Sequence, residues 1–442
     1  MWNIKSGYVL LGLLALMMST PILAAAANPA KSDAPAYRFI NGRWFDGTGF
    51  RPKQLYAVRG RFSTVKPRGI VRTIDLKGGY VVPPFGEAHN HNIYEPPEVD
   101  AVIARYLRDG VFYVKNPNNL ARSRATLVGR INVPTSIDVT FSNGGLIGSG
   151  GHPTDIASRN IARGSWTPAD GEGGFYHTID TLADLDKKWP LILAERPDFI
   201  KTYLLYSEEY EKRRDDPAYG VWKGLSPQIL AEITRQAHAA GLRVATHVET
   251  AADFRNALAA GVDEINHLPG FRPDRGKLTN YSNPAVYRLT EEDARSAAKK
   301  DVIVVTTISG VLKKLTEAKP GTAEATLALA AKKLVADNIS ILRRHGVPVV
   351  IGSDEYRETS AIEAKSLAHL GVLDNLSLLK MWSEATPRAI FPRRKLGKLM
   401  HGYEASFLVL AGNPLKDFTA TESILMRVKQ GHLLPPPAQL TP

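Results

Sequence analysis

Two histidines, His89 and His91, stand two positions apart in the segment VVPPFGEAHNHNIYEP, residues 81–96. In a β-strand, residues i and i+2 project from the same face, so both imidazoles would leave the end of this apolar stretch together. Adjacent imidazoles fill a core poorly but are good ligands for a metal ion. The spacing therefore predicts a metal site at a strand end.

Four more residues with metal-binding or acid–base side chains end strand-like stretches further along the chain. They are Lys201 in DFIKTYL, His247 in VATHVE, His267 in EINHLP and Asp354 in VIGSDE. A single histidine at a strand end is more often structural, whereas six compatible side chains at the ends of five strands are hard to explain by packing. We expect these six residues to converge on one site.

Such convergence needs a scaffold that brings distant segments together, and the middle of the chain alternates strand-like with helix-like stretches. One unit is clear, because Ser226 suits a helix N-cap, Pro227 its first position and Gly241 its end. Eight stretches are predicted as strands from their apolar, β-branched composition. They cover residues 81–90, 111–116, 132–141, 197–204, 242–248, 263–268, 302–309 and 347–354.

Eight strands separated by helices predict an α/β fold, a (β/α)8 TIM barrel, over residues 81–395. In such a barrel the catalytic side chains lie at the C-terminal ends of the strands, where the six residues above are found. An open, doubly wound sheet is the alternative, but no glycine-rich nucleotide-binding loop follows the first strand. The strand-like segments 36–80 and 396–434 are expected to form one small β-sandwich domain.

The first 26 residues differ from the rest of the chain. Lys5 precedes an apolar run from Tyr8 to Met18, and small residues with an A-x-A pattern follow. This arrangement predicts a secretory signal peptide, and an uncleaved membrane anchor fits less well because the run is short for a bilayer. We therefore expect a periplasmic or secreted protein.

The cysteine content and the charge of the chain limit the classes of partner that it can bind. The chain has no cysteine, which excludes disulfides and thiolate metal sites. Its formal charge of +12 comes from dispersed basic residues, and no nucleic-acid-binding module is recognisable. We expect a small-molecule substrate, no nucleic-acid partner and no stable membrane span once the leader is removed, and a homo-oligomer is left open.

The pattern of strand-end residues resembles the amidohydrolase superfamily, the metal-dependent hydrolases, over nearly the whole mature chain. The shared features are the H-x-H pair, a lysine on the fourth strand, histidines on the fifth and sixth, an aspartate on the eighth and a β domain formed by both termini. The interval from His247 to His267 and the IKTY around Lys201 most resemble the imidazolonepropionase-like and Xaa-Pro dipeptidase-like branch.

The resemblance implies two divalent metal ions, usually zinc. His89, His91 and Asp354 would bind the more buried ion, His247 and His267 would bind the other, and a carboxylated Lys201 would bridge them. The ions would lower the pKa of a shared water, giving a metal-bound hydroxide, and would polarise the substrate carbonyl. Asp354 would carry the proton to the leaving group. For Lys201, a structural ion pair is the alternative.

Two residues are candidates for contact with the substrate. His152 lies in GGLIGSGGHPT, residues 144–154, which resembles the glycine-rich loop of the dipeptidase-like branch; a loop-stabilising histidine is the alternative. Tyr203 shares the strand face of Lys201 and would hydrogen-bond the scissile carbonyl or the tetrahedral intermediate. A buried structural tyrosine is the competing interpretation.

Other segments depart from the family pattern. The chain has PPFGEAHNH where many relatives have PGLIDxHxH, and GVFYVKNPNN where relatives commonly have GVTTVRD. Lys115 in the second segment would either touch an anionic substrate group or be solvated or ion-paired. The helical stretch 313–344 is long enough to cover the pocket. These departures concern the choice of substrate more than metal binding.

We therefore expect an exported, binuclear metal-dependent hydrolase that cleaves an amide, peptide-like or cyclic C–N bond. A second hypothesis keeps the metal site but changes the reaction to ester hydrolysis or decarboxylation. An alternative from another class is a binding barrel that has lost catalysis. The complete ligand set argues against that alternative.

Overall fold

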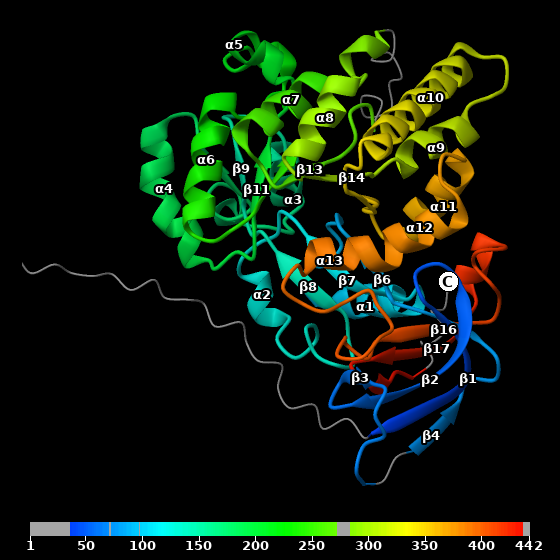
Figure 1. Cartoon of the computed structure of the whole chain (residues 1–442). Helices are drawn as coiled ribbons and strands as arrows, with labels where there is room; N and C mark the ends of the chain where they lie inside the picture. Colours follow the sequence, from blue (N-terminus) through cyan, green and yellow to red (C-terminus); the bar gives the residue numbers. More distant parts are fainter. Residues whose placement is uncertain (1–35, 70–71, 97, 272–282, 436–442) are drawn as a thin grey trace, which may run out of the picture.

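Residues 36–69, 72–96, 98–271 and 283–435 are described in the computed structural model of the chain, and the predicted leader 1–26 lies outside the described residues. Strands from the beginning and the end of the chain, blue and red in Figure 1, lie side by side in one sheet. The alternating strands and helices between them form a barrel that packs against this sheet (Figure 1).

All eight strands predicted for the barrel are present, although most are shorter than expected. They are β6 (Phe85–Glu87), β7 (Val111–Asn116), β8 (Asp138–Phe141), β11 (Ile200–Tyr203), β12 (Val244–His247), β13 (Glu264–Asn266), β14 (Ile303–Val305) and β15 (Val349–Val350). Six pairs of neighbours among them form ladders, and all six are parallel. The predicted α/β barrel is confirmed.

The strands are divided between two hydrogen-bonded ladders, β6–β7–β8 and a second one that runs from β11 to β15. Isolated backbone hydrogen bonds cross both gaps between the ladders. The Asp198 N–H donates to the Phe141 carbonyl at 2.8 Å, and the Ala88 N–H donates to the Ile351 carbonyl at 2.8 Å. The eight strands thus follow one another around the barrel with weak pairing at two positions.

Two short strands that the sequence did not predict extend the second ladder. They are β9 (Gly145–Ile147), which pairs with β11, and β10 (Tyr176–Thr178). Both belong to the long connection between β8 and β11, and the predicted glycine-rich loop begins on β9.

Helices cover the outside of the barrel, and their ends follow the capping signals in the sequence. The Ser226 hydroxyl accepts from the Gln228 N–H at the start of α6, and Gly261 takes the left-handed conformation, φ +77°, after α7. The helices are α1 (Glu98–Arg108), α2 (Ser123–Thr126), α3 (Thr154–Ala162), α4 (Leu182–Ala194), α5 (Tyr210–Arg213), α6 (Pro227–Ala239), α7 (Ala251–Ala260), α8 (Glu291–Lys299), α9 (Ser309–Glu317), α10 (Ala323–Arg344), α11 (Ser360–Leu370), α12 (Asn375–Lys380) and α13 (Thr386–Ile390).

Both termini supply the strands of the second sheet. They are β1 (Tyr37–Phe45), β2 (Phe50–Val58), β3 (Arg61–Ser63), β4 (Arg72–Asp75), β5 (Tyr80–Val82), β16 (Phe407–Leu410), β17 (Ile424–Lys429) and β18 (His432–Leu433). The strand predicted over residues 81–90 is therefore two strands, because β5 pairs with β1 and β16, whereas β6 belongs to the barrel. Pro83 and Pro84 stand between them, and proline has no N–H to continue a ladder.

This second sheet curls until its opposite strands meet. Phe62 on β3 and Phe407 on β16 lie 6.0 Å apart between ring centroids, although β5, β1 and β2 separate the two strands in the sheet. Phe39 and Trp44 on β1 also pack against Phe407. The curled sheet surrounds this aromatic core and has the two-layered character of a small sandwich.

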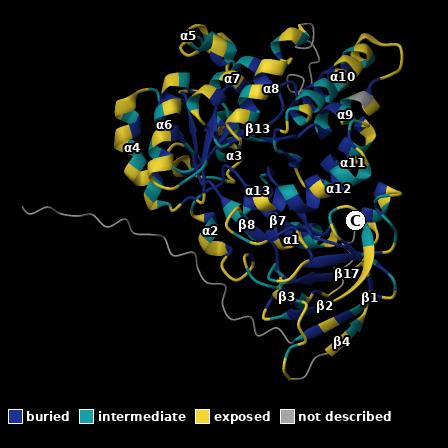
Figure 2. Cartoon of the chain, in the orientation of Figure 1, coloured by how far each residue is buried: buried dark blue, intermediate teal, exposed yellow. Residues whose placement is uncertain are grey.

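One hydrophobic core joins the barrel to this sheet. Figure 2 shows the barrel strands and β16 of the terminal sheet in the buried colour, while exposed residues lie on the outer faces of the helices and on parts of β2 and β4. At the base of the barrel Phe85 stacks on Trp382 with ring centroids 3.6 Å apart. Among the described residues, none of the helices has both the length and the apolarity needed to cross a membrane.

Candidate metal centre

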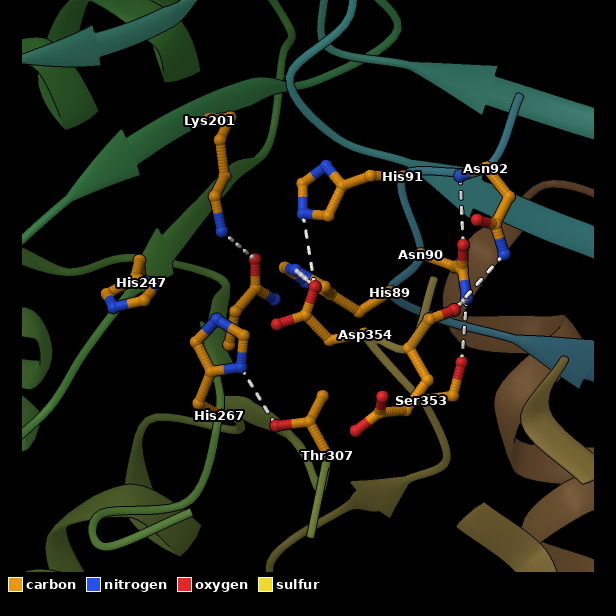
Figure 3. A network of polar contacts seen from close by, with 12 residues as sticks. His89, Asn90, His91, Asn92, Lys201, His247, His267, Thr307, Ser353 and Asp354 are labelled. Carbon is orange, nitrogen blue, oxygen red and sulfur yellow. Dashed lines mark hydrogen bonds and ion pairs between the residues drawn. The ribbon is translucent and has the colours of Figure 1, made fainter. Parts of the chain in front are cut away.

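The six residues singled out at the strand ends lie together in the structure. Lys201 and His247 belong to β11 and β12, and the other four lie one to four residues beyond the ends of β6, β13 and β15. They line one cavity of about 340 Å³ at the C-terminal end of the barrel, and Figure 3 shows their side chains pointing toward one another. The members are His89, His91, Lys201, His247, His267 and Asp354.

The distances between these side chains are those of one continuous cluster. The Asp354 Oδ1 atom lies 3.4 Å from His91 Nε2 and 3.8 Å from His89 Nε2. The His267 ring lies 4.6 Å from the His89 ring and 4.4 Å from the His247 ring, between centroids. One ligand atom from each of His89, His91 and Asp354 falls within 4.8 Å of the others, a spacing that a single cation can span.

The backbone at this rim adopts conformations that non-glycine residues rarely take. His267, Thr307 and Asp354 have φ angles of +76°, +56° and +50°. Such angles cost of order 1–3 kcal/mol each and persist where the surroundings over-determine them, often at functional sites. Gly352 is needed for a related reason, since a Cβ atom there would lie 2.8 Å from the His89 Cβ.

Burial keeps the imidazoles of the H-x-H pair neutral. It lowers the pKa of His91 to about 4, although Asp354 opposes this shift, and it lowers the pKa of His89 well below the usual range. The contacts with Asp354 at neutral pH are therefore not ion pairs. Nδ1 of His89 is buried without a hydrogen-bond partner among the described residues. Neutral imidazoles beside a carboxylate are suited to bind a cation.

The two histidines on the other side of the cavity each use one ring nitrogen for a neighbouring side chain. His247 Nε2 lies 2.9 Å from Glu249 Oε1, and His267 Nδ1 lies 2.8 Å from Thr307 Oγ1. Contacts of this kind orient the imidazole of a metal ligand and select the nitrogen that binds. If these two histidines hold a cation, Nδ1 of His247 and Nε2 of His267 would be the ligand atoms.

Lys201 is fully buried, and its surroundings favour the neutral amine. Burial lowers its pKa to about 7, against the opposing effects of Asp354 and Glu264. The Nζ atom donates a hydrogen bond of 2.6 Å to Oδ1 of Asn266, which is a neutral acceptor (Figure 3). This contact is not the ion pair considered as the alternative. A nitrogen and oxygen donor set with a neutral lysine fits two divalent cations and a carboxylated Lys201.

Asparagines that alternate with the two histidines hold the loop that carries Asp354. Asn90 donates to Ser353 Oγ at 2.8 Å (Figure 3). Asn92 donates to the Glu358 carbonyl at 2.8 Å. Glu87 accepts from the Ser353 N–H at 2.8 Å. Sequence reasoning missed this role, and the only signal was the HNHN alternation itself.

His152 also lines this cavity, and its contact with a substrate stays a prediction. Its Nδ1 lies 3.1 Å from Asp155 Oδ1, and Asp155 also pairs with Arg159 at 2.9 Å. The His152 ring is 5.6 Å from the ring of Tyr203 and 5.8 Å from the ring of His247. The imidazole is thus both tied to α3 and turned toward the metal ligands.

Tyr203 lines the cavity and is 3% exposed. Burial raises its pKa well above the usual value, so the hydroxyl remains a hydrogen-bond donor. A glycine makes room for it: a Cβ atom on Gly145 would lie 2.7 Å from the Tyr203 ring and 2.1 Å from Asn118 Oδ1. The GG sequence at the start of β9 therefore serves the close approach of this strand to β11.

Two further expectations have different outcomes. Lys115 is away from the cavity lining and forms a buried ion pair of 2.7 Å with Glu264, as the ion-pair alternative predicted. The segment 313–344 forms part of α9 and all of α10, and the described residues that line the cavity come from other segments.

Aromatic and charged side chains form the rest of the cavity wall, and sequence reasoning did not find them. Their hydroxyls and rings come from loops that are distant in sequence; for example, the hydroxyls of Tyr94 and Tyr356 lie 3.0 Å apart. The set comprises Tyr94, Arg159, Phe175, Tyr206, Trp222, Glu249, Phe271, Glu355 and Tyr356. They suggest a substrate with apolar surface and at least one polar group.

Comparisons with known proteins agree with this geometry. The model of the amidohydrolase family matches residues 222–434. Three solved structures with the same fold are Aspergillus niger ochratoxinase, a putative prolidase from Bifidobacterium longum and molinate hydrolase. Their TM-scores are 0.68, 0.69 and 0.70 at 18%, 17% and 16% identity. The matches cover 90%, 92% and 92% of this chain and 95%, 96% and 97% of the other chains.

A search among curated protein sequences found no match. The family model covers the segment that carries His247, His267 and Asp354, and the fold matches cover at least 90% of the chain. Together with the ligand cluster at the C-terminal rim, the family match assigns residues 222–434 to the amidohydrolase family, and the solved structures show the same fold for the chain.

Proposed function

We propose that the protein binds two divalent cations and hydrolyses an amide, peptide-like or cyclic C–N bond of a small molecule. The observation that carries this proposal is the cluster of four imidazoles, one carboxylate and one buried lysine in a single cavity. Zinc is the expected ion, as the resemblance to the superfamily implies. The nitrogen and oxygen ligands without thiolates suit zinc, and they also suit manganese and cobalt. The similarity to a prolidase and to molinate hydrolase supports the choice of bond.

In this proposal the protein's own residues bind the substrate and move the proton. Cations held by the cluster, once bound, would polarise the substrate carbonyl and acidify a water molecule. Asp354 accepts the proton of that water on a carboxylate oxygen and passes it to the leaving nitrogen. Tyr203 donates its hydroxyl hydrogen to the carbonyl oxygen, which gains negative charge as the water attacks. His152, whose ring lies 5.6 Å from that of Tyr203, also contacts the substrate.

The test combines metal analysis with a substrate panel. The purified protein should contain about two divalent ions per chain. It should hydrolyse at least one member of a panel of dipeptides, N-acyl amino acids and lactams, and lose that activity when a chelator removes the ions. Zinc, manganese or cobalt should restore it. A folded protein that holds no divalent ion before any chelator is added would contradict the proposal. If the protein hydrolyses only ester analogues, the cleaved bond is an ester bond rather than a C–N bond.

Export is part of the same proposal and is supported by the leader-like sequence of residues 1–26. Expression of the full chain in a bacterial host should give a periplasmic or secreted protein whose N-terminus lies near residue 26 or 27. Recovery of the full-length chain from the cytoplasm would refute export without affecting the metal site.

A further inference from the structure

A chain of buried polar side chains lies beneath Lys201 inside the barrel. Lys115 Nζ donates to Glu264 Oε2 at 2.7 Å, Asn266 Nδ2 donates to Glu264 Oε1 at 2.7 Å, and Lys201 Nζ donates to Asn266 Oδ1 at 2.6 Å. These four residues are between 0% and 5% exposed. The chain therefore links three strands, β7, β11 and β13, through contacts shielded from water.

The position of this chain follows from barrel geometry. β7, β11 and β13 are the second, fourth and sixth barrel strands, and alternate strands contribute side chains to the same interior layers. Such layers are usually filled with branched apolar residues. Burying Lys115 and Glu264 there costs desolvation energy, and apolar residues of similar size would often be at least as stabilising. Stability alone is therefore a poor reason for this arrangement.

The contacts determine which way the Asn266 amide points. An ionised Glu264 can only accept hydrogen bonds, so the NH2 group of Asn266 must face it and the amide oxygen must face Lys201. Lys115 balances the charge of Glu264 at 2.7 Å. As a result, the lysine amine meets a neutral and oriented acceptor rather than a carboxylate.

We infer that Asn266, oriented by the Glu264–Lys115 pair, is a positioning residue that holds the Lys201 nitrogen at the place from which it bridges two cations. This inference rests on the proposed function, since it concerns Lys201 as a ligand. To become that ligand, the neutral amine nitrogen bonds to the carbon of CO2 and releases one proton to solvent. The carbamate nitrogen keeps one N–H, which can retain the bond to Asn266 Oδ1.

Asn266→Leu removes the acceptor at nearly constant volume. Loss of a residue that orients a ligand typically weakens metal affinity by ~10–100-fold. We expect this variant to lose about one of its two ions at limiting metal concentration. It should also show a weaker carbamate signal in ¹³C NMR after incubation with ¹³C-bicarbonate.

A second variant tests the same role in case Asn266→Leu does not fold. Lys115→Met/Glu264→Gln removes both buried charges together, so no charge is left unpaired, and it should fold while the Asn266 amide loses its fixed orientation. Lys115→Arg keeps the pair and should preserve both ions. Thr202→Val is a matched control. It removes a buried 2.7 Å contact between Thr202 on β11 and Thr246. Because Thr202 is the residue next to Lys201 on this strand, its side chain lies on the opposite face.

The outcomes separate the two proposals. Two ions and a carbamate signal in the wild type, with both reduced in Asn266→Leu and the double variant but not in Thr202→Val, would support the positioning role. Two ions and an unchanged carbamate signal in both variants would overturn it and leave the proposed function intact. If Thr202→Val loses the ions equally, the effect is structural and the inference fails. One ion or none in the wild type, with no carbamate, would instead refute the binuclear site.

Discussion

Asp354 contacts His89 through both its backbone and its side chain, at the gap between the first and last barrel strands. Its N–H donates to the His89 carbonyl at 2.9 Å, while its carboxylate oxygen lies 3.8 Å from His89 Nε2. This backbone contact crosses the same gap as the Ala88–Ile351 hydrogen bond, and it also sets the spacing between two candidate ligands. This coupling explains why the left-handed φ of +50° at Asp354 is tolerated.

Asp354→Asn separates the two roles of this carboxylate. The amide oxygen can still coordinate weakly and the other ligands remain, so the protein should fold and keep much of its metal. Because an amide cannot take the proton of the attacking water, the turnover number should fall by roughly 10²–10⁴-fold. Steady-state kinetics with metal analysis of the same sample will check this. A metal-replete variant with near-normal turnover would falsify the proton-transfer role.

Lys201→Ala tests the bridging ligand directly. Without the lysine nitrogen the bridging oxygens cannot form, so the ion content should fall from about two to about one per chain and activity should fall with it. Short-chain carboxylic acids such as acetate or propionate should partly restore both, because they fit the space left by the side chain and supply carboxylate oxygens. Full metal content and full turnover in the variant, without added acid, would assign Lys201 a structural role.

His152→Ala examines the substrate side of the cavity. If the imidazole contacts the substrate, its loss should raise KM by about ten- to a hundredfold, the equivalent of ~1.5–3 kcal/mol for a hydrogen bond to a charged group. Metal content should not change. Asp155→Asn should raise KM less, since it only loosens the orientation of the imidazole. His369→Ala, on the exposed side of α11, is the control. Loss of folding in His152→Ala would favour the loop-stabilising interpretation instead.

Glu195 links stability to pH. Burial raises its pKa from 4.5 to about 7, partly offset by a hydrogen bond from the Gly144 N–H. The folded state thus holds a proton that the unfolded state has lost between pH 4.5 and 7, and stability falls as pH rises through this window. Glu195→Gln mimics the protonated form. The free energy of unfolding of the variant, relative to that of wild type, should therefore be higher at pH 8 than at pH 5 by about 1 kcal/mol. Thermal melts at pH 5 and pH 8 measure the stability difference between the variant and wild type. An equal difference at both pH values would contradict the assignment.

Much of the site could be predicted from the sequence because its signals are local. The two-residue spacing of His89 and His91 places both side chains on one face of a strand end, whatever the rest of the chain does. Capping signals such as Ser226 and Gly261 likewise act within one helical turn and located the helices that separate the strands. Alternation of strand and helix then restricts the fold to a few topologies. Barrel geometry places all strand ends on one rim.

Only the tertiary structure decided what lies around those ligands. Asn266 is 65 residues from Lys201, and Glu264 is 149 residues from Lys115, so no local pattern relates either pair. Their contacts exist because alternate strands share an interior layer, which depends on how the strands are staggered around the barrel. The aromatic wall is likewise assembled from separate loops. The sequence by itself determined which residues could bind metal and where their strands end, and the packed barrel determined their partners, pKa shifts and cavity.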